Sequence, residues 1–232
     1  MILAAGLGTR LKPWTDKHPK ALAVVNGKSL LQRNIAYLQQ FGIYDVVVNV
    51  HHFAGQIMEE LETNHGFGSN ISISDESDEV LETGGGLKKA EWFFENEKEP
   101  FLLMNADILT DLDINAMKLQ HVSSGALATL AVTTRPTSRN LLFDQDNTLC
   151  GWKNIATGEL KGKDGSPKAF SGVHIIEPRI FSLIWEQGKF SMIDLYLRLC
   201  QSHTIMSFDH SEGKFQDVGK PESIAEAENL FP

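Results

Sequence analysis

The chain alternates strand-like apolar runs with amphipathic helical runs over residues 1–110. The apolar runs predict strands at Met1–Ala5, Tyr44–Val50, Asn70–Asp75 and Pro100–Asn105. The runs between them carry apolar residues at helical spacing and predict helices at Ser29–Phe41, Ala54–Asn64 and Gly85–Glu95. Strand–helix–strand units build parallel sheets, so the pattern predicts an α/β fold with mostly parallel strands.

The rest of the chain is richer in strands. We expect a hairpin at Arg139–Asn154 and further strands at Ala126–Thr134 and Phe170–Ile176. A flexible polar loop near the ligand is expected at Lys161–Pro167. Helices are expected at Pro178–Gln187, at Met192–Ser202 and from Pro221 onward. No repeat and no linker divides the chain, so we predict one domain, residues 1–232, with an appended β-rich region.

Composition narrows the class of protein. The chain has 232 residues and a formal net charge of −9, which argues against a nucleic-acid partner because such proteins usually present a basic face. No apolar run reaches the roughly 18 residues of a membrane span and no secretory leader is visible, so we expect a cytoplasmic protein without a membrane partner. Cys150 and Cys200 lack metal-site spacing and are expected to be reduced.

The first expected strand leads into a basic, glycine-rich segment, AAGLGTRLKPWTDKHPK, at residues 4–20. Two common phosphate motifs do not fit the chain: the dinucleotide fingerprint fails at Leu11 and the P-loop pattern fails at Leu22. What remains is a glycine turn whose backbone N–H groups face an anion, with Arg10 and Lys20 behind them. A lone G-x-G is more often a plain turn, so the argument depends on the whole string.

This string resembles the signature (A/G)-G-x-G-T-R-L-x-P-x-T-x-x-x-P-K of the sugar-1-phosphate nucleotidylyltransferases, and no family-defining position departs. Further segments resemble, in order, the family's base-recognition, metal-binding, sugar-binding and second metal-binding segments. They read LETGGGLKKA (81–90), FLLMNADILTD (101–111), FSGVHIIEP (170–178) and FQDVGKPESIAEAE (215–228). The resemblance extends over essentially the whole chain.

The resemblance implies a Rossmann-like, three-layer α/β/α fold with a mixed, mostly parallel central sheet and a small β-rich sugar-binding region. Residues 1–110 would form a nucleotide-binding half and residues 111–232 a sugar-phosphate-binding half. The implied activity is transfer of a nucleotidyl group from a nucleoside triphosphate to a sugar 1-phosphate, with release of pyrophosphate and with Mg²⁺ as cofactor.

The resemblance also assigns roles to residues. Nucleotide binding falls on Ala4, Ala5, Gly6, Gly8, Thr9, Arg10, Lys20, Thr83, Gly84 and Gly85. Sugar binding falls on Glu82, Asn105, Ser171 and Gly172, and Mg²⁺ binding on Asp107 and Asp217. Catalysis is expected to depend on Arg10, Lys20 and Asp107. For Glu82, ligand contact and a plain surface position are equally open.

The chemistry suits these residue types. Two anions must approach each other, so charge neutralisation and in-line positioning should dominate catalysis. Two carboxylates far apart in sequence suit Mg²⁺, which prefers oxygen ligands. A phosphate monoester is already a nucleophile and needs no general base, so His51 and His52 are interpreted as packing or surface residues. Asp111 and Asp113 are interpreted as helix-capping acids.

Within the family, the short length and the strings LETGGG, NAD and FSG are most similar to enzymes that act on N-acetylmuramic acid 1-phosphate, with UTP as donor. Mannose, glucose or heptose 1-phosphate with GTP or dTTP is the alternative, and a non-catalytic regulatory domain that binds nucleotide-sugars is a third reading. Many relatives carry a Glu-Lys-Pro element that is absent from the segment KGKDGSPKAF, in which Lys168 could take the place of that lysine.

We also expect a monomer. Because the first strand is short, we expect native residues before Met1.

Overall fold

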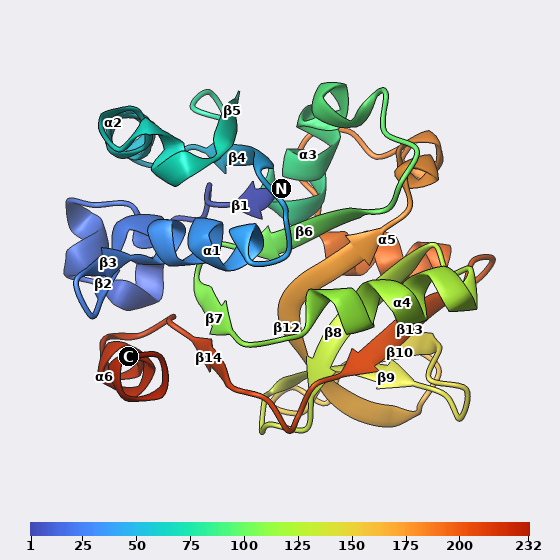
Figure 1. The fold of residues 1–232 in the computed structure, drawn as a ribbon. Helices are drawn as coiled ribbons and strands as arrows, with labels where there is room; N and C mark the ends of the chain where they lie inside the picture. Colours follow the sequence, from blue (N-terminus) through green and yellow to red (C-terminus); the bar gives the residue numbers. More distant parts are fainter.

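The computed structural model describes residues 1–232 and centres on a ten-stranded mixed sheet (Figure 1). Its parallel part has the order β6–β1–β4–β5, formed by β6 (Phe101–Asn105), β1 (Ile2–Leu3), β4 (Asp45–Val50) and β5 (Asn70–Asp75). The predicted parallel core is confirmed. The first strand is shorter than expected, because the chain leaves the sheet at Ala4, whose N–H group donates to the side chain of Asn49.

A long antiparallel strand, β12 (Ser166–Ile176), joins this parallel part to the rest of the sheet. Its end pairs with β6 and with β8 (Ala128–Thr133), and β8 pairs in parallel with β13 (Ile205–Asp209). The register between β12 and β8 shifts between Phe170 and His174. The sheet is therefore mixed, as predicted.

The predicted hairpin is formed by β9 (Arg139–Phe143) and β10 (Leu149–Asn154), and β11 (Leu160–Gly162) adds to its outer edge. The loop predicted at Lys161–Pro167 is confined to residues 163–165, because the residues on either side belong to the end of β11 and the start of β12. Its glycines serve close backbone packing: a Cβ at Gly162 would lie 2.5 Å from the carbonyl oxygen of Cys150.

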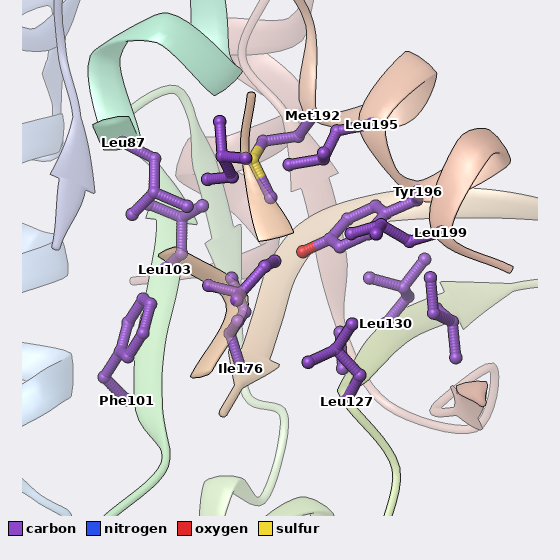
Figure 2. Close-up of a cluster of buried hydrophobic side chains, with 14 of the residues drawn as sticks. Leu87, Phe101, Leu103, Leu127, Leu130, Ile176, Met192, Leu195, Tyr196 and Leu199 are labelled. Atoms are coloured by element: carbon purple, nitrogen blue, oxygen red, sulfur yellow. The ribbon is translucent and has the colours of Figure 1, made fainter. Parts of the chain in front are cut away.

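Helices cover both faces of the sheet and complete three layers. One face carries α3 (Glu82–Lys89) and α5 (Met192–Leu199), whose apolar side chains pack on β6, β8 and β12 (Figure 2). The opposite face carries α1 (Leu30–Gln39), α2 (Ala54–Thr63) and α4 (Ile114–Ser124). The predicted fold class is confirmed.

Successive residues of the central strands enter opposite cores. Val47 and Leu103 belong to the cluster under α3 and α5, whereas Val46, Val48 and Met104 belong to the cluster under α1, α2 and α4. Strand side chains alternate between faces, so a run such as VVVNV supplies both cores at once.

A third, smaller core lies beneath the glycine-rich loop. It joins Leu11 to a two-stranded ribbon of β2 (Val24–Val25) and β3 (Lys28–Ser29) and to the last helix, α6 (Pro221–Leu230). It also includes Leu109 and Val218. Leu109 lies in β7 (Ile108–Thr110), which pairs with β14 (Phe215–Asp217) in a second ribbon, and Val218 directly follows β14. Segments far apart in the sequence are thereby packed into one unit.

The two predicted capping acids have different roles. Asp113 is the N-cap of α4 as predicted, and its Oδ1 accepts the N–H of Ala116 at 3.0 Å. The same prediction for Asp111 is wrong. Its Oδ1 accepts the N–H of Lys214 at 2.7 Å and so joins the end of β7 to the chain before β14.

Two predicted helices are shorter than their sequence patterns. The segment expected as a helix at Gly85–Glu95 is α3, which already begins at Glu82, followed by a separate 3₁₀ turn at Glu91–Phe94. The helix expected at Pro178–Gln187 is a 3₁₀ turn at Pro178–Leu183. Arg198 donates to the carbonyl oxygen of Leu183 at 2.8 Å, so that carbonyl is satisfied without a further helical turn.

Neither cysteine is disulfide-bonded, as predicted. Cys150 and Cys200 are partly buried, and burial raises the pKa of both thiols, which keeps them protonated and weakly nucleophilic at neutral pH. None of the helices has the length and apolar character needed to span a membrane.

His174 makes the stability of the fold depend on pH. It lies on β12 with 1% exposure, its Nδ1 is 2.8 Å from the hydroxyl of Tyr196, and burial lowers its pKa to about 3. In the unfolded chain the pKa is near its ordinary value of about 6.5, so the unfolded state takes up a proton first as pH falls. The stabilisation from neutral His174 is complete above pH 6.5 and is lost toward pH 3.

We expect the free energy of unfolding to fall by about 1 kcal/mol per pH unit between pH 6 and pH 4 because of this one residue. Urea unfolding at pH 7, 6, 5 and 4 measures the slope, and His174→Gln, which cannot take up the proton, should have a correspondingly shallower one. Equal slopes in the two proteins would show that His174 does not carry this effect.

Candidate active site

A cavity of about 600 Å³ opens at the carboxyl ends of β1, β4 and β6. Its wall includes the loop from Leu3 to Thr9, Asn49 near the end of β4, and Asn105 to Asp107 at the end of β6. Ligands of open α/β sheets bind at this edge, because the loops that follow parallel strands meet there. The cavity is therefore the candidate active site, and the predicted residues Ala4, Ala5, Gly6, Gly8, Thr9, Lys20, Glu82, Thr83, Asn105 and Asp107 line it.

The two glycines of the opening loop, Gly6 and Gly8, are needed for different reasons. Gly8 has a φ of 61°, and a Cβ there would lie 2.9 Å from side-chain carbons of Lys20 and Thr15, so the fold itself requires glycine. A Cβ at Gly6 would meet no protein atom within 4 Å. Internal packing gives no reason for glycine at this position, whereas a ligand that approaches the backbone closely does.

Lys20 and Asp107 form an ion pair in the cavity wall, with the Lys20 ammonium donating to Asp107 Oδ2. Lys20 is only 8% exposed, so its charge needs an anionic partner. An ammonium has three donor hydrogens. Lys20 can therefore hold Asp107 and bind a phosphate oxygen at the same time.

Asp217 reaches the neighbourhood of Asp107 through the β7–β14 ribbon. The N–H of Val218, the next residue, donates to the backbone carbonyl of Asp107 at 2.9 Å. The Oδ1 of Asp217 is buried and has no hydrogen-bond partner. A Cβ at Gly219 would lie 2.6 Å from this oxygen and 3.0 Å from Arg10 Nη2, so the cation of Arg10 and this carboxylate both border Gly219.

The residues present fit Mg²⁺. A buried carboxylate oxygen without a partner is costly unless a cation or donor meets it, and carboxylates are the ligands this hard cation prefers. No group of three or more His, Cys, Asp or Glu side chains is placed to hold a metal. Asp107 and Asp217 would therefore share the ion with water and substrate phosphates. Mg²⁺ stays a prediction.

Gly84 and Gly85 lie outside the cavity wall. Their N–H groups both donate to the carbonyl oxygen of Phe190, at 2.9 and 3.2 Å, and a Cβ on either would clash with the segment from Gly188 to Phe190. These glycines bring the start of α3 against that segment, which leaves Thr83 on the cavity. Their direct contact with a nucleotide stays a prediction.

Glu82 lies in the wall of the cavity with a φ of 59°, a conformation that is unfavourable for a residue other than glycine. Its carboxylate is 3.6 Å from the ammonium of Lys189, which lines the same cavity. Direct contact of Glu82 with a ligand stays a prediction.

The predicted sugar-binding serine and glycine lie behind the cavity wall. Ser171 is 1% exposed and its Oγ is 2.8 Å from His210 Nε2. Gly172 has a φ of 75°, and a Cβ there would lie 2.7 Å from the amide nitrogen of Asn105, which does line the cavity. Gly172 thus leaves room for the Asn105 side chain. Direct contact of Ser171 or Gly172 with a sugar stays a prediction.

Sequence reasoning missed several residues of the wall: Val80, Asn49, Arg139, Lys189 and Ser191. Asn49 had a visible signal, since it is a lone polar residue in a buried strand. Its Oδ1 accepts the N–H of Ala4 and its Nδ2 donates to Glu76 Oε1, each at 2.7 Å. Arg139 and Lys189 had no local signal, because only the tertiary fold brings them to the cavity.

Other basic side chains considered from the sequence have structural partners. His51 Nδ1 is 2.6 Å from the carbonyl oxygen of Glu76, and His52 Nε2 is 3.3 Å from that of Thr15, in keeping with packing roles. Lys168 donates to Asp209 at 2.5 Å and lies outside the cavity wall, and its role in place of the missing Glu-Lys-Pro lysine stays a prediction.

Comparison with known proteins identifies the family. A family model described as Nucleotidyl transferase matches residues 1–231. The N-acetylmuramate alpha-1-phosphate uridylyltransferase of Neisseria meningitidis serogroup B is 33% identical, over 99% of this chain and 96% of that protein. The enzyme of the same name from Caulobacter vibrioides is 31% identical, over 98% and 94%. Mannose-1-phosphate guanyltransferase 2 of Candida glabrata is 26% identical, over 100% and 64%.

A solved structure shares the fold. The putative glucose-1-phosphate thymidylyltransferase from Bacillus anthracis, in complex with a sucrose, matches with a TM-score of 0.81 at 19% identity, over 99% of this chain and 93% of that one. Together with the family match, the fold and the site define an enzyme class. The chain belongs to the nucleotidyl transferase family and is a nucleotidyltransferase, as the sequence predicted.

The two loop glycines provide a matched test of the phosphate-binding interpretation. Gly8→Ala should lower the free energy of unfolding by about 1–3 kcal/mol, because it forces a Cβ into a positive-φ position against Lys20 and Thr15. Gly6→Ala should leave stability within about 1 kcal/mol of wild type but weaken UTP binding at least about tenfold, because its methyl group occupies ligand space.

Urea unfolding measures the first effect, and titration calorimetry with UTP and Mg²⁺ measures the second. Unchanged UTP affinity in a folded Gly6→Ala variant would mean that the loop does not contact the nucleotide.

Proposed function

We propose that this nucleotidyltransferase transfers the uridylyl group of UTP to N-acetylmuramic acid 1-phosphate and releases pyrophosphate. The observation that carries the proposal is the Lys20–Asp107 ion pair beside a glycine loop whose backbone is open to the cavity. The choice of substrates is supported by two relatives of nearly the same length, both named for that reaction.

The reaction is a displacement at phosphorus. An oxygen of the sugar phosphate forms a bond to the α-phosphorus of UTP, and the bond from that phosphorus to the bridging oxygen breaks, so that pyrophosphate leaves in line. The N–H groups of the loop and the Lys20 ammonium hold the phosphates in this geometry. Arg10 lies beside Gly219 and Asp217, just outside the residues that line the cavity. From there it would stabilise the charge that develops on the departing pyrophosphate.

Asp107 and Asp217 would hold Mg²⁺, which supplies positive charge to the reacting phosphates. Lys20 keeps one oxygen of Asp107 engaged and so fixes the orientation of this carboxylate before substrates bind. The buried Oδ1 of Asp217, which has no hydrogen-bond partner, would be available as a ligand of the ion. No side chain has to take a proton from the nucleophile, because the phosphate monoester is already anionic.

Pyrophosphate release tests the proposed substrates. The assay contains Mg²⁺ and pairs UTP, GTP, dTTP or CTP with the 1-phosphates of N-acetylmuramic acid, glucose, mannose or a heptose. Release with UTP and N-acetylmuramic acid 1-phosphate alone is expected. Release with another pair would support nucleotidyl transfer but overturn the assigned substrates. Silence across the panel, with nucleotide binding intact, contradicts catalysis and favours a regulatory domain.

The two aspartates should be separately essential. Asp107→Asn and Asp217→Asn are each expected to lower kcat by at least about 10²- to 10³-fold, since each removes a charge at the reacting phosphates. Asp146→Asn, in the exposed turn between β9 and β10, is the matched control and should retain wild-type activity. Steady-state kinetics at saturating Mg²⁺ measure the effect, and an active Asp217→Asn enzyme would remove this residue from the mechanism.

A further inference from the structure

Arg139 is the one residue between positions 108 and 188 that lines the active-site cavity. It begins β9, in the β-rich part of the sheet, whereas the rest of the wall comes from residues 3–107 and from Lys189 and Ser191. The choice of sugar is expected to depend on the second half of the chain. Arg139 is therefore the side chain through which the β-rich region reaches the cavity.

The charges of the cavity leave Arg139 without a partner. Two of the three cationic side chains are occupied: the Lys20 ammonium by Asp107 and that of Lys189 by Glu82, at 3.6 Å. The guanidinium of Arg139 makes neither an ion pair nor a hydrogen bond within the protein, and the residue is exposed. The pairs cancel, so one uncompensated positive charge remains in the wall, at Arg139.

The backbone that carries Arg139 is held in place. The Arg139 N–H donates to Thr137 Oγ1 at 3.3 Å, and Asn140 Nδ2 donates to the carbonyl oxygen of Thr137 at 3.2 Å. The N–H of Ile155, from the end of the hairpin, donates to the carbonyl oxygen of Ser138 at 2.8 Å. The arginine thus extends from an ordered frame, and its unpaired head group is available to a ligand.

Arg139 and the glycine-rich loop enter the cavity from different parts of the sheet. β9 pairs with β12 at Ser166–Lys168, whereas β6, the neighbour of β1, pairs with β12 at Val173–Ile176. In the proposed reaction, Lys20 would bind the reacting phosphates near the ends of β1 and β6. The sugar ring would then lie in the cavity between these phosphates and Arg139.

We propose that Arg139 recognises a carboxylate on the sugar substrate and selects for it. This assignment rests on the proposed function, because N-acetylmuramic acid is N-acetylglucosamine with a lactyl ether, which adds one carboxylate at a distance from the phosphate. A guanidinium presents two parallel N–H donors that match a carboxylate. A sugar without the carboxylate leaves the guanidinium of Arg139 without an anionic partner. The enzyme would therefore bind the carboxylate-bearing sugar more tightly than the neutral one.

The test compares two sugar phosphates in wild type, Arg139→Gln and Arg139→Lys. Arg139→Gln should raise the KM for N-acetylmuramic acid 1-phosphate by about 10- to 100-fold, the range for a charged hydrogen-bonded pair. The KM for UTP should change by less than about threefold. The response to N-acetylglucosamine 1-phosphate, followed as substrate or as competitive inhibitor, should also change by less than about threefold. Arg139→Lys should recover part of the loss, because it restores the charge but not the paired donors.

The control is Arg179→Gln, which removes another exposed arginine away from the cavity, and thermal melting checks that all variants are folded. Equal losses with both sugar phosphates would mean that Arg139 binds phosphate, and no loss would mean that it does not touch the substrate; either overturns the assignment. Wild-type protein that does not use N-acetylmuramic acid 1-phosphate would overturn the proposed function and this assignment together. If the wild-type protein uses N-acetylmuramic acid 1-phosphate but the Arg139 variants do not show the expected loss, only the assignment of Arg139 fails.

Discussion

The ion pair between Lys20 and Asp107 connects the two segments on which the site depends, the glycine-rich loop after β1 and the segment after β6. The fold holds both partners in place. Gly8 packs directly on the Lys20 side chain, and the small core under the loop combines Leu11 with Leu109 of β7 and Val218 beside β14. The glycine-rich loop and the strands next to both aspartates are therefore packed as one unit, so their charges would need little rearrangement on substrate binding.

A buried polar network of Asn49 and Glu76 positions the start of the glycine-rich loop. Asn49 accepts the N–H of Ala4 at the point where the chain leaves β1, and it donates to Glu76, which is fully buried. Burial raises the pKa of the Glu76 carboxyl. A Cβ at Gly86 would lie 2.7 Å from both Asn49 Nδ2 and Glu76 Oε1, so the glycine of α3 makes room for the pair. The start of the loop is thus fixed by side-chain bonds rather than by a long first strand.

The sequence indicated those features whose causes are local. The alternation of strands and helices follows from neighbouring residues. The roles of Lys20 and Asp107 are implied by the family resemblance, and the structure places both residues in the cavity wall. Contacts made across the sheet had no such signal. Arg139 reaches the cavity only because β9 pairs with β12, and Gly84 and Gly85 fit against Phe190, which follows about a hundred residues later. The glycines of the polar segment at residues 161–167 indicate a loop when the sequence is considered alone, although they serve the close pairing of strands.

The most direct test of the account is a crystal structure of the protein with UTP and Mn²⁺ in place of Mg²⁺. The anomalous signal of Mn²⁺ should lie between the carboxylates of Asp107 and Asp217, with the triphosphate along the loop from Ala4 to Thr9 and Lys20 in contact with both Asp107 and a phosphate oxygen. A metal held elsewhere, or a nucleotide outside this cavity, would contradict the claim that the loop and the two aspartates form one triphosphate site.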